Sequence, residues 1–326
     1  MSAFFGKEIN SVKQRLERIR EDGSLVFALF SDLHTRHVEF EKTNILASAL
    51  HELCQEVRTD AVIDLGDNLA MLGREEHITN ERLKTTLTEI FDRIKESVSL
   101  PLFLINGNHD AVGTDFFKPS LWNEVVKGKY DDSLASYSNS GSYYYVDYEE
   151  ANTRLVFISL PSDSDLESEM PCPDWKLGKD QIEWLDKTAL NTDKDILLFT
   201  HVPMYYDYLG DRSETLAVWD GEKPAFSYIR SLCGWIEDRD EAAFVINKRG
   251  NVIACFSGHT HNDALWAPLE NRDRHTNPLC CPQVITGWAI GESEDPGIAI
   301  DLLVYNPKDK TCNMLRFGDG EDRKIK

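Results

Sequence analysis

The sequence LINGNHD, from Leu104 to Asp110, joins an apolar run to a short polar turn. The apolar residues 102–105 are typical of a buried strand. Gly107 permits a sharp turn at which a residue with a Cβ would be strained. An amide, an imidazole and a carboxylate therefore follow a rigid element, a common place for catalytic residues in α/β proteins. Taken alone, Asn-His-Asp here also fits a turn or a helix N-cap.

Four further apolar segments also end in polar clusters, and helical patterns separate many of them. The predicted strands with polar ends are 25–30, 61–65, 102–106, 196–199 and 252–256. The predicted helices are 8–20, 42–58, 79–98, 178–190 and, in two pieces, 225–248. This alternation predicts βαβ units with parallel neighbours, whose strands end at one edge of a sheet.

Other segments are predicted to be strands or loops around this core. Strands are expected at 142–148, 154–160, 283–288, 297–304 and 312–317. The consecutive C-terminal strands are expected to be antiparallel to one another. Irregular polar stretches predict a long loop or a small insertion over the site at 111–140, and loops at 161–177, 204–222 and 267–281. No repeat, low-complexity tract or flexible linker divides the chain, so we expect one domain over residues 1–326.

Composition and charge exclude several classes of function. The chain has 326 residues, 41% hydrophobic, and a net charge of −21, which opposes binding to nucleic acids or anionic membranes. We find neither a signal peptide nor an apolar run of the roughly 18 residues that a membrane helix needs. Seven cysteines without a C-x-x-C motif do not predict a disulfide framework or a structural zinc site. We therefore expect a cytoplasmic protein; its oligomeric state stays open.

The five polar clusters contain residue types that bind metal ions. They are Asp32-x-His34, Gly66-Asp67, Gly107-Asn108-His109-Asp110, His201 and Gly258-His259-x-His261. Imidazole suits Zn, Fe and Mn, and carboxylate or amide oxygens add hard ligands. Alternate residues of an extended segment point the same way, so each x-spaced pair could serve one cavity. Seven ligands suffice for two ions if one carboxylate bridges them, an arrangement suited to in-line phosphoryl displacement.

The ordered set resembles the signature of the calcineurin-like metallophosphoesterase superfamily: D-x-H, GD, GNH-D/E, H and GH-x-H. Every block is present between residues 32 and 261. The resemblance implies an α/β fold, a four-layer α/β/β/α sandwich of two mixed sheets flanked by helices. We expect the core signature to span 24–262 and the C-terminal strands, 283–317, to complete the second sheet.

The resemblance also implies a role for each residue of the clusters. Asp32, His34 and His261 would bind one ion, Asn108, His201 and His259 the other, and Asp67 would bridge them. His109 would face the leaving-group oxygen as a general acid, and Asp110 would orient His109. The ions, expected to be Mn, Fe or Zn, would supply a bridging hydroxide that attacks phosphorus in line. Their positive charge would let an acidic protein hold an anionic substrate.

The predicted function is therefore dinuclear metal-dependent hydrolysis of a small or nucleotide-like phosphate ester. Phosphomonoesterase and phosphodiesterase activities remain alternatives, since class III cyclic-nucleotide phosphodiesterases share the five blocks. A metal-dependent binding or scaffold module with little activity is a further alternative. Nucleic acid and membrane partners are not expected. Arg36 and His37 could contact a phosphate or lie in a solvated loop. Tyr205, Tyr206 and Tyr208 could line a substrate pocket or serve only ordinary loop packing.

Overall fold

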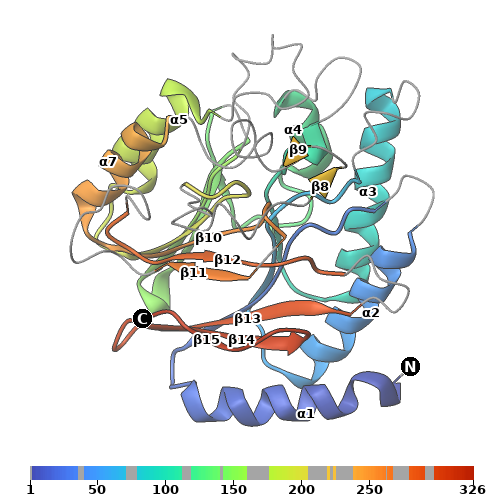
Figure 1. Cartoon of the computed structure of the whole chain (residues 1–326). Coiled ribbons are helices and arrows are strands. Elements are labelled where there is room, and N and C mark those ends of the chain that lie inside the picture. Colours follow the sequence, from blue (N-terminus) through green and yellow to red (C-terminus); the bar gives the residue numbers. More distant parts are fainter. Residues whose placement is uncertain are drawn as a thin grey trace.

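The computed structural model shows two β-sheets stacked face to face and covered by helices (Figure 1). The structure describes residues 2–35, 40–70, 79–111, 119–139, 142–159, 176–204, 219–220, 223–224, 238–261, 263–266, 279–290 and 297–326. Within these ranges, no helix combines the length and apolar character needed to cross a membrane.

The first sheet has six strands in the order β15-β14-β13-β1-β2-β3. Their bounds are β1 Leu25–Phe30, β2 Ala61–Asp64, β3 Leu102–Leu104, β13 Ala299–Asn306, β14 Thr311–Gly318 and β15 Arg323–Lys324. The pairs β1–β2 and β2–β3 are parallel, whereas β13 is antiparallel to β1. The three parallel strands therefore end at one edge of the sheet, as the alternating sequence predicts.

The second sheet has seven strands in the order β11-β12-β10-β7-β6-β5-β4. Their bounds are β4 Ser136–Tyr137, β5 Tyr144–Tyr148, β6 Thr153–Phe157, β7 Asp195–Phe199, β10 Val252–Ser257, β11 Ala264–Trp266 and β12 Gln283–Ile285. Strands β6, β7, β10 and β12 are parallel neighbours. Two short strands, β8 Trp219–Asp220 and β9 Lys223–Pro224, form a separate hairpin.

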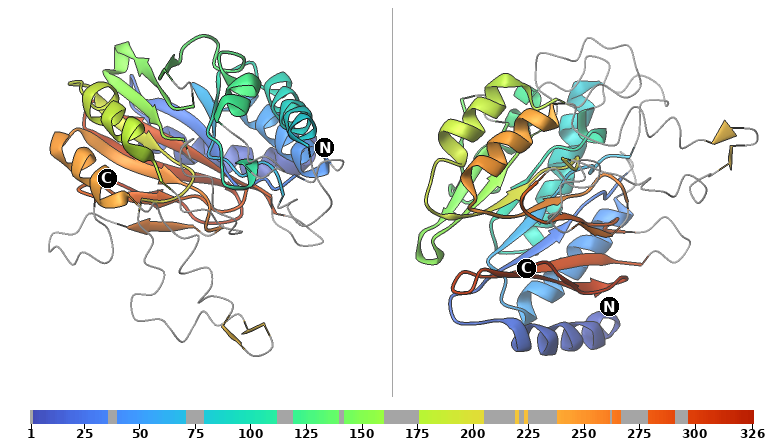
Figure 2. Two further views of the ribbon diagram at one scale, coloured as in Figure 1. Left: turned by 90° about the horizontal axis from the view of Figure 1, so that it is seen from above. Right: turned by 60° about the vertical axis from the view of Figure 1, so that its left-hand side comes forward.

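Helices cover the outer face of each sheet (Figure 2). Beside the first sheet lie α1 Ser2–Ile19, α2 Glu41–Glu56, α3 Asn80–Ser97 and α4 Pro119–Val126. Beside the second lie α5 Gly178–Trp184, continued by the π-helix η3 Leu185–Ala189, and α7 Arg239–Arg249. Short 3₁₀ turns are η1 His109–Ala111 and η2 Glu149–Ala151. The four-layer α/β/β/α sandwich expected from the sequence is thus confirmed.

Three apolar layers hold these elements together. Alternate residues of β1 show the division: Val26, Ala28 and Phe30 face the helices, whereas Phe27 and Leu29 face the second sheet. A third cluster joins the second sheet to α5, η3 and α7. All six residues of β1 are buried, which explains why its sequence is continuously apolar rather than alternating.

Two sequence-based expectations are wrong. Strands 283–317 do not all complete the second sheet: only β12 lies there, while β13 and β14 pair in the first sheet, because β13 takes the free edge of β1. The predicted loop 111–140 contains α4 and β4. Helix α4 forms because it buries Trp122 against Phe91, with ring centroids 5.8 Å apart.

Some expectations lie outside the described residues. These are the proposed roles of Arg36, His37, Tyr205, Tyr206 and Tyr208, the first piece of the predicted helix 225–248, and most of loops 161–177, 204–222 and 267–281. We propose that residues 1–326 form a single domain, because β13 and β14 join the C-terminal part to β1 near the N-terminus. Limited proteolysis tests this: two stable, separable fragments would contradict it.

Candidate metal centre

The loops that follow the parallel strands of both sheets meet at one edge of the molecule. After β1 and β2, the Asp32 N–H donates to the Gly66 carbonyl at 2.9 Å and the His34 N–H to the Asp67 carbonyl at 3.0 Å. After β7 and β10, the Gly258 N–H donates to the His201 carbonyl at 3.0 Å. These backbone bonds align the loops and bring the polar clusters together.

Two groups of donor atoms form where the loops meet. The first contains Asp32, His34, Asp67 and His261, and the second Asp67, His201 and His259; within each group the donor atoms lie within 4.8 Å of one another. Asp67 belongs to both groups. Asn108 joins the second, because its Oδ1 lies 3.0 Å from His201 Nε2 and 2.7 Å from His259 Nδ1.

The carboxylates of Asp32 and Asp67 are each oriented by a backbone N–H of another loop of the site. Asp32 Oδ2 accepts a hydrogen bond from the His259 N–H at 3.0 Å, and Asp67 Oδ1 accepts one from the His109 N–H at 2.7 Å. The other oxygens face imidazoles: Asp32 Oδ1 lies 3.2 Å from His261 Nε2, and Asp67 Oδ2 lies 3.2 Å from His201 Nε2. Both carboxylates are almost completely buried.

Several buried polar atoms fit bound cations. Asp32 Oδ1 and Asp67 Oδ2 have no hydrogen-bond partner among the described residues. The Nε2 atoms of His34 and His261 face each other at 3.0 Å, so a proton or a cation must lie between them. His201 Nδ1 donates to the Leu65 carbonyl at 2.8 Å, which turns Nε2 toward the site. This is the usual way a metal-binding histidine is held.

The backbone of the candidate ligands differs from the expected extended form. Asp32, His34, Asp67, His259 and His261 all have positive φ, between 49° and 73°. Side chains rarely adopt this left-handed region, and such strain concentrates at functional sites. The x-spaced pairs therefore converge through left-handed turns, not through the alternation of a strand.

The carboxylates of the site are in the charged form that binds metal ions, whereas an ion at His201 would displace the proton of its Nε2. Burial opposes the charge of Asp32, but the neighbouring His261 and His34 rings hold its pKa well below the usual range. Burial opposes the charge of Asp67 too, and nearby His201 and His109 still lower its pKa. Burial would lower the pKa of His201, whereas the Asp67 carboxylate raises it to about 9. The oxygens are thus anionic at neutral pH, the form that binds cations.

Asp110 does not orient His109 as expected. Its two oxygens instead accept hydrogen bonds from four backbone N–H groups, those of Asp67, Asn68, Leu69 and Gly107, at 2.9–3.1 Å. The buried Asp110 carboxylate thus ties the loop after β2 to the loop after β3. The His109 ring lies beside the first group, with Nε2 3.7 Å from Asp67 Oδ2, and its Nδ1 is buried without a partner in the described chain.

Gly107 allows the two loops to approach, and we predict that Gly107→Ala disrupts the site. A Cβ on Gly107 would lie 2.0 Å from Asp67 Oδ1 and 2.2 Å from Asp67 N. We expect the free energy of unfolding to fall by about 1–3 kcal/mol, as in overpacked cores, and metal content to drop. Gly6→Ala is the control, because nothing lies within 4 Å of that Cβ. Denaturant unfolding and metal analysis of both variants measure this; equal behaviour would contradict the prediction.

Trp288 and Lys42 belong to the site's surroundings, although sequence reasoning missed both. The Trp288 ring lies 4.2 Å from the His261 ring and 5.6 Å from the His34 ring, measured between centroids. Lys42 Nζ lies 5.6 Å from the Trp288 centroid. No local motif marks either residue: Trp288 comes after β12, and Lys42 lies in the first turn of α2.

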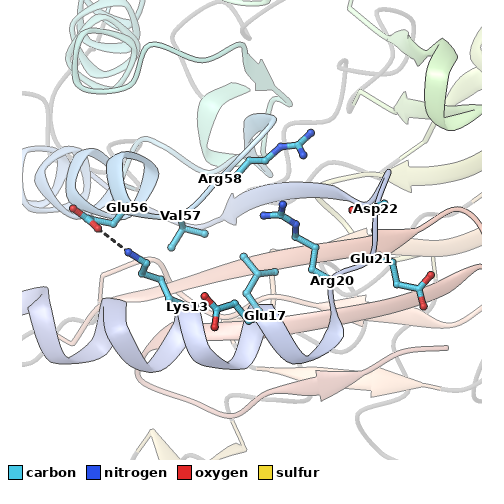
Figure 3. Close-up of a pocket in the computed structure, with 9 residues that line it drawn as sticks. Lys13, Glu17, Arg20, Glu21, Asp22, Glu56, Val57 and Arg58 are labelled. Atoms are coloured by element: carbon cyan, nitrogen blue, oxygen red, sulfur yellow. Dashed lines mark hydrogen bonds and ion pairs between the residues drawn. The ribbon is translucent and has the colours of Figure 1, made fainter.

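A charged surface pocket lies at the opposite edge of the first sheet (Figure 3). It is lined by the C-terminal part of α1 and by residues 56–58 before β2, and Lys13 pairs there with Glu56 at 2.8 Å. None of the candidate ligands lines it. The pocket lies at the N-terminal ends of β1 and β2, whereas the donor groups follow the C-terminal ends of these strands. The pocket is therefore separate from the candidate centre.

Comparisons with known proteins agree with this arrangement. The calcineurin-like phosphoesterase family matches residues 25–263. A dimetal phosphatase from Danio rerio is similar in structure, with TM-score 0.60 and 14% identity over 92% of this chain and 98% of that one. PhoD is also similar, with TM-score 0.52 and 10% identity over 93% of this chain and 72% of that one. No curated protein matches the sequence.

Proposed function

The chain belongs to the calcineurin-like phosphoesterase family, and from this we propose that it is a dinuclear metal-dependent hydrolase of phosphoric esters. The observation that carries the proposal is the convergence of seven donor residues on two groups that share Asp67, with two buried carboxylate oxygens that have no hydrogen-bond partner among the described residues. Two bound divalent ions would activate a water molecule and bind phosphate oxygens. We propose that the substrate is small or nucleotide-like.

The protein's own residues would hold the ions and prepare the site. We propose that Asp32, His34 and His261 hold one ion, and that Asn108, His201 and His259 hold the other, with Asp67 between them. The left-handed turns in the loops after β1, β2 and β10, together with the backbone hydrogen bonds between loops, fix these side chains before any substrate binds. Such preorganisation avoids reorganisation during the reaction. Mn, Fe and Zn all suit this mixture of nitrogen and oxygen ligands.

His109 is proposed as the general acid. Burial lowers the pKa of His109 in the structure, which favours the neutral ring. A bound phosphate would add negative charge next to the ring and raise its pKa, since an opposite charge within about 4–6 Å favours the protonated form. The ring, 13% exposed, could then pass its proton from Nε2 to the departing alkoxide. Asp110 would support this indirectly, by fixing the loops that carry Asp67 and His109.

Metal removal and reconstitution test the proposed function. We expect chelator treatment to lower the turnover of p-nitrophenyl phosphate or bis-p-nitrophenyl phosphate by at least about 100-fold, because bound ions supply several kcal/mol of transition-state stabilisation. Mn²⁺, Fe²⁺ or Zn²⁺ should restore it, with two ions per chain. The substrate that is cleaved faster would separate monoesterase from diesterase activity. Two bound ions without turnover of either ester would favour the binding or scaffold module.

We also propose a cytoplasmic location. The described cysteines, Cys54, Cys255, Cys280, Cys281 and Cys312, are all free thiols, which suits a reducing compartment. Fractionation of cells that express the chain tests this, and recovery from an oxidising compartment would contradict it.

A further inference from the structure

A buried ion network connects the C-terminal strands β13, β14 and β15. Arg316 of β14 and Arg323 of β15 both contact Asp301 of β13, with Arg316 Nε 3.0 Å from Asp301 Oδ1. The three side chains are 2%, 10% and 0% exposed. Buried charges are costly unless they are paired and hydrogen-bonded, so this network must hold a defined geometry.

The network crosses from the first sheet to the second through Asp263. Asp263 Oδ1 pairs with Arg316 Nη2 and lies 3.4 Å from Arg323 Nη1. The same oxygen accepts a hydrogen bond from the Gly287 N–H at 3.0 Å. Asp263 directly precedes β11 and comes two residues after His261. The charges of the two arginines and the two carboxylates balance. Within the network, Asp263 is the residue that connects to the loop carrying His261.

Asp263 is connected to His261 in two ways, through the chain and through Gly287. Along the chain, Asp263 fixes the end of the loop that carries His261. Through Gly287 it fixes the residue before Trp288, whose ring meets the His261 ring edge to face, 4.2 Å between centroids and 81° between planes. His261 is the most exposed side chain of its donor group, at 32%, whereas Asp32 and Asp67 are at 0% and 1%. Its ring therefore depends most on such support.

We propose that Asp263, Arg316 and Arg323 are positioning residues that fix His261 and Trp288 and so set the affinity of the Asp32–His34–His261 group for its ion. The inference rests on the proposed function, because that function supplies the metal centre. It goes beyond the family match, which ends at residue 263, because both arginines come from the C-terminal strands after it. Partners of this kind around a metal site typically change its affinity 10–100-fold.

Metal titration of full-length Asp263→Asn is the first test. With Mn²⁺ as the probe in isothermal calorimetry, we expect one of the two ions to bind about 10–100-fold more weakly than in the wild type. Asp147→Asn is the matched control. Asp147, on β5, accepts hydrogen bonds from Nε and Nη2 of the buried Arg154 on β6, at 2.7 Å and 2.8 Å. This pair lies away from the candidate centre. Asp147→Asn should leave both affinities unchanged. A folded Asp263→Asn protein that binds both ions as the wild type does would overturn the proposal.

Conservative replacement of the arginine gives a second variant if Asp263→Asn does not fold. Arg323→Lys keeps the charge but loses the forked geometry that contacts two carboxylates. We expect weakening of the same ion, smaller than for Asp263→Asn. Arg154→Lys is its control. Equal weakening in Arg323→Lys and Arg154→Lys would show a general loss of stability and overturn the positioning role.

Hydrogen exchange of the metal-free proteins separates this inference from the proposed function. We expect amides of residues 258–261 to exchange at least about tenfold faster in Asp263→Asn than in the wild type, and not in Asp147→Asn, because the loop loses its anchor. Unchanged exchange would overturn the positioning role whatever the activity. Two tightly bound ions without ester hydrolysis would instead overturn only the proposed function.

Discussion

Asp67→Ala is expected to empty at least one of the two ion sites and to lower ester hydrolysis by more than about 100-fold. Asp67 is the only residue that the structure places in both described donor groups. Partners that merely support a ligand already cost up to about 100-fold, so loss of a shared ligand should cost more. Metal analysis by mass spectrometry and steady-state kinetics of the purified variant measure this.

The variant Asp67→Asn tests the negative charge of Asp67 separately from the size and shape of its side chain. It can keep the hydrogen bond that Asp67 Oδ1 accepts from the His109 N–H at 2.7 Å, while it removes the negative charge facing His201. We expect Asp67→Asn to fold like the wild type and still lose an ion. A stoichiometry of two ions in both variants would show that Asp67 is not the bridging ligand.

His109→Ala is expected to leave both ions bound and to slow the chemical step. Neither donor group found among the described residues includes His109, although its Nε2 lies 3.7 Å from Asp67 Oδ2. General acid catalysis typically contributes 10²–10⁴-fold, so we expect losses of about that size for alkyl phosphates. Nitrophenolate leaves readily without a proton, so its ester should be affected much less. The ratio of the two losses is the measurement.

Two results would contradict the role of His109. Equal losses for poor and good leaving groups would show that His109 binds substrate rather than protonating the leaving group. Loss of a bound ion would show that His109 supports the metal centre, and His109→Gln would then check whether a polar side chain restores it. His51→Ala is a suitable control, because His51 lies on α2 and its Nδ1 contacts the Ser97 carbonyl at 2.7 Å, away from the donor groups.

Local sequence was sufficient for much of the fold and for the candidate ligands. Continuous apolar runs such as 25–30 and 252–257 are buried throughout, so their composition shows the strands directly. Ligand residue types follow these runs at once, and parallel strands deliver them to one edge. Asp32, His34, Asp67, Asn108, His201, His259 and His261 could therefore be selected before the structure was known, and the structure brings them together.

Only the tertiary structure decided the features that depend on distant pairing. The place of β13 beside β1 joins residues about 275 positions apart, and no local pattern distinguishes the two sheets. Asp110 supports two loops rather than His109, because four N–H groups from two chain segments reach its carboxylate. The left-handed turns at the ligands, Trp288 against His261, and the Asp263–Arg316–Arg323 network arise in the same way. The sequence determines which residue types are available at each strand end. The contact partners of these residues depend on which distant segments the packed sheets bring together.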